Sequence, residues 1–190
     1  MLDKLRKNFG LCSVLTDVAF LVAYSFGNWQ TTYQLLQSGV LFTGFNFTKS
    51  NTTLFAIPTM LIGGVITLLL LKWLCRILLT SCGFFSVPKR EYTLIATLFA
   101  GGYHFAMGLV NLIGLFTPLA SVWISTIVPF VLTAVALFAF YKVTANLYFN
   151  DVTKANYVNR LFVVFAVFCA IQIINALSAI ISVTTGGAVL

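Results

Sequence analysis

The chain has 190 residues, of which 60% are hydrophobic and 8% are charged, and its mean hydropathy is +1.01. Soluble domains carry about 25% charged residues, so this composition excludes a water-soluble globular domain and predicts a membrane protein. The net charge of +7 does not indicate nucleic-acid binding, because the eleven Lys and Arg residues are spread through short connections between apolar segments, which is the positive-inside pattern.

The first 47 residues predict one irregular crossing of the membrane. Residues 1–10 are basic and are expected in the cytoplasm, and residues 11–47 then form the crossing. The segment Gly27–Gln30 interrupts its apolar stretch, so a long tilted helix or an interfacial helix followed by a broken span both fit. A hairpin of two short spans ranks lower, because it would place the basic N-terminus outside. Asn46 and Asn51 each begin an N-glycosylation pattern, and we interpret both as polar loop residues.

Four long apolar runs follow, and they predict a four-helix membrane core over residues 54–185. Each run is close to the roughly 20 residues that a helix needs to cross a bilayer, and none alternates as the strands of a membrane barrel would. The whole chain, residues 1–190, is therefore expected to be a single transmembrane domain. The runs are Leu54–Leu71, Thr93–Phe116, Leu119–Tyr141 and Leu161–Val183.

The basic residues of the core fall only in alternate gaps between these runs. The gap after the first run and the gap after the third run are basic, whereas the turn around Pro118 and the segment 184–190 carry no Lys or Arg. The basic gaps therefore lie in the cytoplasm. Because Leu54 must then follow an outside segment, residues 11–47 cross an odd number of times. The prediction is an all-α bundle of five spans, with the N-terminus in the cytoplasm and the C-terminus outside.

Polar side chains inside the spans are the candidate intramembrane contacts, since an ionisable group in lipid is costly and often functional. Asp17 lies within reach of the basic N-terminal segment. His104 is interpreted either as a neutral histidine bonded to another helix, which we favour, or as a proton relay or ligand contact. Asn111 follows His104 by seven residues and shares its helix face. The full set is Asp17, His104, Asn111, Gln172 and Asn175.

No catalytic, metal or nucleotide motif occurs in the sequence, and no Asp or Glu lies inside the four apolar runs. We therefore expect no enzyme activity, no cofactor and no metal. The four cysteines lack a Cys-x-x-Cys pair and are interpreted as small packing residues. The basic connections form the only sizeable polar surface, which makes them the candidate cytoplasmic interaction surface. Its residues are Lys72, Arg76, Lys89, Arg90, Lys142, Lys154 and Arg160.

Three features of the layout recur in a known family. A basic connection ends in Phe84–Tyr92, and a span with the aromatic–glycine patch Gly101–Phe105 follows. A Lys154-Ala155 step precedes the last span. With these features, the chain from about Leu54 to Leu177 resembles the Yip family of small five-span membrane proteins. The resemblance implies a bacterial-type, non-enzymatic membrane protein associated with membrane organisation or with a transporter complex. Rab-GTPase binding is not implied, because the long cytoplasmic extension of the eukaryotic members has no counterpart before residue 11.

These patterns predict a non-catalytic, multi-pass membrane protein that acts through partners, as an accessory or scaffold subunit or in membrane organisation. The expected partners are the lipid bilayer and a protein in the membrane or at its cytoplasmic face, with a homo-oligomer left open and no nucleic acid. The expected location is a bacterial cell membrane, and a eukaryotic endomembrane is the open alternative. The alternative function is a small transporter or channel component whose path is lined by the third span, Thr93–Phe116.

Overall fold

The computed structural model describes residues 8–37, 49–81, 83–116, 121–150, 153–167 and 169–170. Helices make up nearly all of these residues, and no strand occurs among them. The predicted all-α class is therefore confirmed. Contacts divide the chain into two units, residues 1–116 and residues 117–190, and each unit is described by itself.

Helix α2 (Phe9–Gln37) is one uninterrupted helix, which agrees with the long helix that was one of the two alternatives left open around Gly27–Gln30. Glycine and asparagine are weak helix formers in water. In a membrane helix, however, small residues are placed where a second helix approaches closely, and the helix continues through them. An interfacial helix followed by a broken span is thus excluded for residues 9–37. Asn46 lies outside the described residues.

Helix α3 (Lys49–Ser81) is the longest and begins before the apolar run. Asn51 lies in its first turn, so the interpretation of Asn51 as a loop residue is wrong. Its hydroxyls bond within the helix: Thr67 donates to the Gly63 carbonyl at 2.8 Å, for example, which satisfies a polar side chain without a partner helix.

Gly83 ends α3 and turns the chain toward α4. Its φ is +71°, a left-handed conformation that glycine adopts without strain. Gly83 N donates to the Thr80 carbonyl and Phe84 N donates to the Leu79 carbonyl, the pair of bonds of a Schellman cap. Leu79 and Phe84 are both buried, as the apolar contact that accompanies this cap requires.

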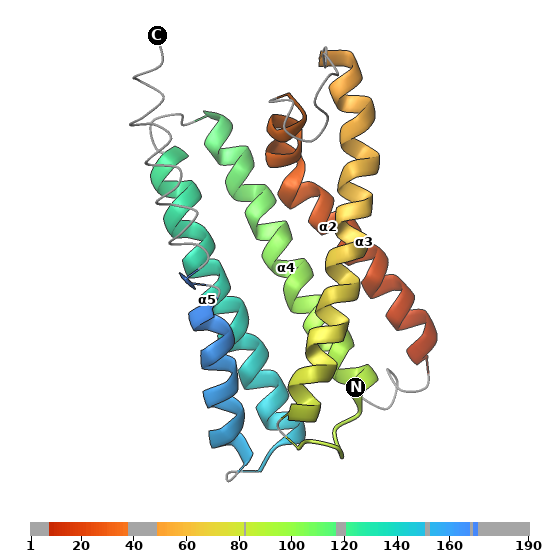
Figure 1. The fold of residues 1–190 in the computed structure, drawn as a ribbon, viewed down its shortest axis with the longest axis vertical. Helices are drawn as coiled ribbons and strands as arrows, with labels where there is room; N and C mark the ends of the chain where they lie inside the picture. The colour runs from red at the N-terminus through yellow and green to blue at the C-terminus, as the bar shows by residue number, and fades with distance from the viewer. Residues whose placement is uncertain are drawn as a thin grey trace. The chain divides into compact units, whose positions relative to one another are not determined.

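Helix α4 (Lys89–Phe116) starts immediately after Pro88 and carries Glu91 in its first turn. A carboxylate there is favourable because the N-terminal end of a helix dipole is positive. Within the first unit, α2 contacts both α3 and α4, and α3 also contacts α4 (Figure 1). The three helices therefore form one packed group with α2 as the shared member.

The second unit contains α5 (Ser121–Tyr148) and a returning helix over residues 153–167 and 169–170. Asn150 caps the returning helix: its Oδ1 accepts from Thr153 N at 3.0 Å, and Asn150 N donates to Thr153 Oγ1 at 3.1 Å. This reciprocal pairing is the arrangement of a capping box. The two helices are thus joined by a short connection around residues 149–152.

Four helices among the described residues are long and apolar enough to cross a membrane: Phe9–Tyr33, Asn51–Ser81, Lys89–Gly114 and Ile127–Tyr148. Large apolar side chains stay exposed along them, such as Val22, Leu69 and Ile113 at 58–66%. These surfaces fit contact with a lipid bilayer, so the chain is a multi-pass membrane protein. A fifth span and the orientation stay predictions.

Candidate functional site

His104 lies on the side of α4 that packs against α2. Its ring makes edge contacts with Phe20 and Tyr24, with centroids at 5.7 and 4.8 Å. Asn28 Nδ2 lies 3.3 Å from His104 Nδ1 and also donates to the Tyr24 carbonyl at 2.9 Å. Because an amide nitrogen only donates, Nδ1 is the acceptor in this pair. The arrangement therefore suits the neutral ring with its proton on Nε2.

Asn111 lies two turns further along α4 and reaches the backbone of α2. Its Nδ2 donates to the Gly27 carbonyl at 2.8 Å. The two helices are very close at this level, because a Cβ at Gly27 would overlap the backbone carbonyl of His104. The same close approach repeats at Gly108, where a Cβ would overlap the ring of Phe26. Two glycines and two polar side chains therefore hold α2 against α4.

Tyr24 joins the third helix of the unit to this contact. A Cβ added to Gly63 would lie 3.1 Å from the Tyr24 hydroxyl. A Cβ added to Gly64 would lie 3.1 Å from Cδ1 of the Tyr24 ring. Gly63 and Gly64 thus leave space for the tyrosine against α3, and the same ring also contacts His104. We call Tyr24, Gly27, Asn28, His104 and Asn111 the polar cluster.

A second polar contact joins α2 to α3. Lys72 Nζ and Asp17 Oδ2 are 2.6 Å apart, and their side chains are 27% and 28% exposed. Asp17 was expected within reach of the basic N-terminal segment, whereas the described contact is with Lys72. Lys72 is thus engaged inside the bundle rather than only with water and headgroups.

The other basic residues of the predicted surface lie at helix ends or on outer faces. Arg76, Lys89 and Arg90 are exposed and flank the α3–α4 turn. In the second unit Lys142 and Arg160 are exposed, and Lys154 is half-buried beside the capping residue Asn150. We call Arg76, Lys89 and Arg90 the basic end of the first unit.

The sequence pattern indicates His104, Asn111 and Asp17, and the structure brings the first two together on the α2 side of α4. It missed Tyr24, Gly27 and Asn28, although a Gly-Asn pair in the middle of an apolar stretch is a signal for close helix packing. Gln172 and Asn175 lie outside the described residues. No three His, Cys, Asp or Glu side chains gather closely enough to hold a metal ion in the part of the chain that the structure describes.

No family model, curated protein or solved structure matches this chain.

Proposed function

We propose that this protein is a non-catalytic integral membrane protein that acts through a protein partner, as an accessory or scaffold subunit of a membrane complex or in membrane organisation. The observation that carries the proposal is the division of polar groups in the first unit. Within the spans, Asn28 pairs with His104, Asp17 pairs with Lys72, and Asn111 bonds to the α2 backbone. The exposed charges of the described residues of this unit lie at the basic end.

The intramembrane groups are occupied by helix contacts. Asn111 bonds to the α2 backbone, His104 to Asn28, and Asp17 to Lys72. Bonds of this kind contribute about 0.6–2 kcal/mol each in a membrane, and their combined effect is to fix how three helices pack. This use of polar groups favours a structural scaffold.

The transporter or channel alternative needs a path along α4 that its polar and small residues line. Selective paths expose polar groups to water or to the substrate. Here Gly108 lies under the Phe26 ring, Gly101 lies against Phe20, and the side chains of His104 and Asn111 face α2. These contacts weigh against a path on this side of α4.

The basic end offers a place for a partner. The exposed residues Arg76, Lys89 and Arg90 lie on the two helices that the short turn through Gly83 joins. A patch of one charge sign attracts a surface of the opposite sign and orients it. We place the partner's acidic surface there, on the cytoplasmic side that the charge pattern predicts.

The five-span arrangement, with the N-terminus in the cytoplasm and the C-terminus outside, is part of this proposal. It is supported by the alternation of basic and uncharged gaps and by the unbroken α2, which permits one crossing over residues 9–37. The resemblance to the Yip family and the bacterial cell membrane location belong to the proposal in the same way, and both rest on sequence layout.

The test is co-purification in mild detergent with the combined variant Arg76→Gln, Lys89→Gln, Arg90→Gln. Its matched control keeps every charge: Arg76→Lys, Lys89→Arg, Arg90→Lys. We expect a stoichiometric partner with the wild type and the control, and its loss with the neutral variant. Recovery of the wild-type protein without any partner would contradict the proposal. Recovery of the same partner with the wild type, the neutral variant and the control would also contradict it.

A further inference from the structure

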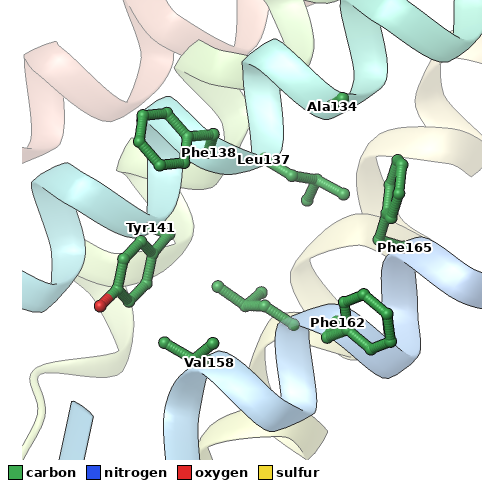
Figure 2. A pocket seen from close by; sticks show the side chains of 8 residues that line it. Ala134, Leu137, Phe138, Tyr141, Val158, Phe162 and Phe165 are labelled. Carbon is green, nitrogen blue, oxygen red and sulfur yellow. The ribbon is translucent and has the colours of Figure 1, made fainter. Parts of the chain in front are cut away.

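The second unit carries an apolar groove between α5 and the returning helix 153–167. Its volume is about 320 Å³, at the lower end of the range of small-molecule sites. Figure 2 shows side chains of both helices turned toward this space. They include Ala134, Phe138 and Tyr141 of α5, and Val158, Phe162 and Phe165 of the returning helix. The Tyr141 hydroxyl is the one polar side-chain group among these six residues.

At one end the groove reaches Tyr141, whose ring centroid lies 6.0 Å from that of Tyr157. Tyr157 is fully buried there, its hydroxyl lies 2.8 Å from Thr144 Oγ1, and its ring centroid is 4.4 Å from that of Phe149. From Tyr141 the groove runs back along α5 to Ala134. Seven residues of helix correspond to about 10 Å, so the groove has the form of a slot for an extended apolar chain.

Positive charge lies at the same end of the groove. Lys142 is exposed, and its Nζ is 5.5 Å from the centroid of the Phe138 ring that lines the groove. Lys154 precedes Val158 by one turn and shares its helix face. Residues 117–190 contain three basic residues and one acidic residue, Asp151, which lies outside the described residues.

We propose that this groove binds an acidic phospholipid, with an acyl chain along Phe138, Val158 and Phe162 and the phosphate beside Lys142. Basic sites between membrane helices are suited to anionic headgroups. The carbon-lined walls suit a hydrocarbon chain, and the Lys142 ammonium at the end of the groove favours a negative headgroup over a zwitterionic one. None of the residues that line this groove belongs to the basic end of the first unit.

The test is native mass spectrometry of the purified full-length chain in detergent, titrated with phosphatidylglycerol or with phosphatidylcholine of the same acyl chains. Three variants separate the contributions. Lys142→Gln removes the charge over the groove. Ala134→Phe fills the groove from an exposed position and therefore spares the packing. Arg160→Gln is the matched control, because Arg160 lies two residues from Val158 and so on the opposite helix face.

We expect phosphatidylglycerol to bind at least about ten-fold more tightly than phosphatidylcholine. Lys142→Gln should weaken phosphatidylglycerol binding about five-fold, the effect of one basic residue near an anionic surface. Ala134→Phe should weaken both lipids, and Arg160→Gln should change neither. Equal binding of the two lipids would overturn the proposal. An equal loss of phosphatidylglycerol binding in Arg160→Gln and Lys142→Gln would also overturn it. So would a lipid-free dimer that Ala134→Phe dissociates, because the groove would then bind a second copy of the chain.

Discussion

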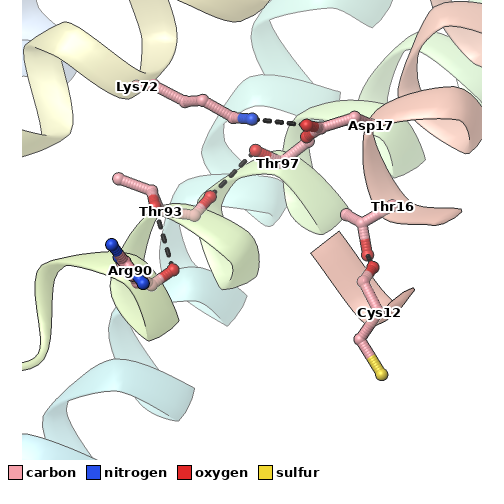
Figure 3. Close-up of polar contacts among 7 residues, drawn as sticks. All are labelled: Cys12, Thr16, Asp17, Lys72, Arg90, Thr93 and Thr97. Atoms are coloured by element: carbon pink, nitrogen blue, oxygen red, sulfur yellow. Dashed lines mark hydrogen bonds and ion pairs between the residues drawn. The ribbon is translucent and has the colours of Figure 1, made fainter. Parts of the chain in front are cut away.

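Asp17 of α2 and Lys72 of α3 form an ion pair at 2.6 Å although 55 residues separate them in the chain (Figure 3). Each residue lies inside a helix that is apolar enough to cross a membrane. A single charge in such a helix is costly, and the pair lowers that cost because each group supplies the other's counter-charge. The contact therefore fixes how α2 and α3 align along their lengths.

The pair predicts that neutralising both residues costs less than the sum of the two single neutralisations. Asp17→Asn or Lys72→Gln alone leaves one unpaired charge between the helices. Each should lower the free energy of unfolding by about 1 kcal/mol, and the double variant should lose less than the sum of the two. Denaturation in mixed micelles of detergent and sodium dodecyl sulfate measures this coupling. Additive losses would show that the pair contributes nothing as a pair.

Gly27 predicts a steric effect on the contact between α2 and α4. In Gly27→Ala the new methyl group overlaps the His104 carbonyl, so the helices must separate, and overpacking of this kind costs about 1–3 kcal/mol. The matched control is Gly102→Ala, since nothing lies within 4 Å of a Cβ there. The unfolding assay should show a loss for the first variant only, and equal stability of the two variants would contradict the close approach.

Asn28 and His104 predict an energetic coupling across the same contact. In a double-mutant cycle with Asn28→Ala and His104→Ala, the coupling should fall near 0.6 kcal/mol, the average for such bonds in a membrane. The cycle of Asn28→Ala with Thr80→Ala provides the control, because Thr80 is exposed and bonds to Arg76 in its own helix. A coupling energy no larger than that of the control cycle would show that the Asn28–His104 bond does not stabilise the contact.

Tyr157 and Thr144 predict a similar effect in the second unit. Tyr157→Phe removes the hydroxyl that lies 2.8 Å from Thr144 Oγ1 in a fully buried position. The ring contacts with Phe149 and Tyr141 remain, so the loss should be about 1 kcal/mol. Thermal unfolding in detergent measures it. A variant as stable as the wild type would show that the hydroxyl pair adds nothing to the stability of this unit.

Much of the fold follows from hydropathy and charge alone. Runs of apolar residues near the thickness of a bilayer predict helices, and the first three runs lie in α3, α4 and α5 where the structure describes them. Most of the run Leu161–Val183 lies outside the described residues. The continuity of α2 did not follow, because Gly27 and Asn28 have low helix propensity when considered locally. Their placement depends on the α4 residues that meet them, His104 and Asn111, which lie more than 70 residues away.

The candidate site could be predicted only in part for the same reason. Asp17 and His104 are conspicuous as ionisable groups in apolar segments, but a single sequence does not say which helix lies opposite them. Asp17 pairs with Lys72, a residue that the charge pattern alone assigned to the cytoplasmic surface. The contacts of the polar cluster are therefore a property of helix packing and not of local sequence.

The most direct test of the proposed partner at the basic end is site-specific photocross-linking in intact membranes. A photoreactive amino acid is placed at exposed Ser86, in the turn between α3 and α4, and in a separate protein at exposed Leu69 in the middle of α3. The account predicts a single adduct of defined mass from position 86, with no such adduct from position 69. The absence of an adduct from position 86 would contradict this prediction. An adduct of the same mass from both positions would also contradict it.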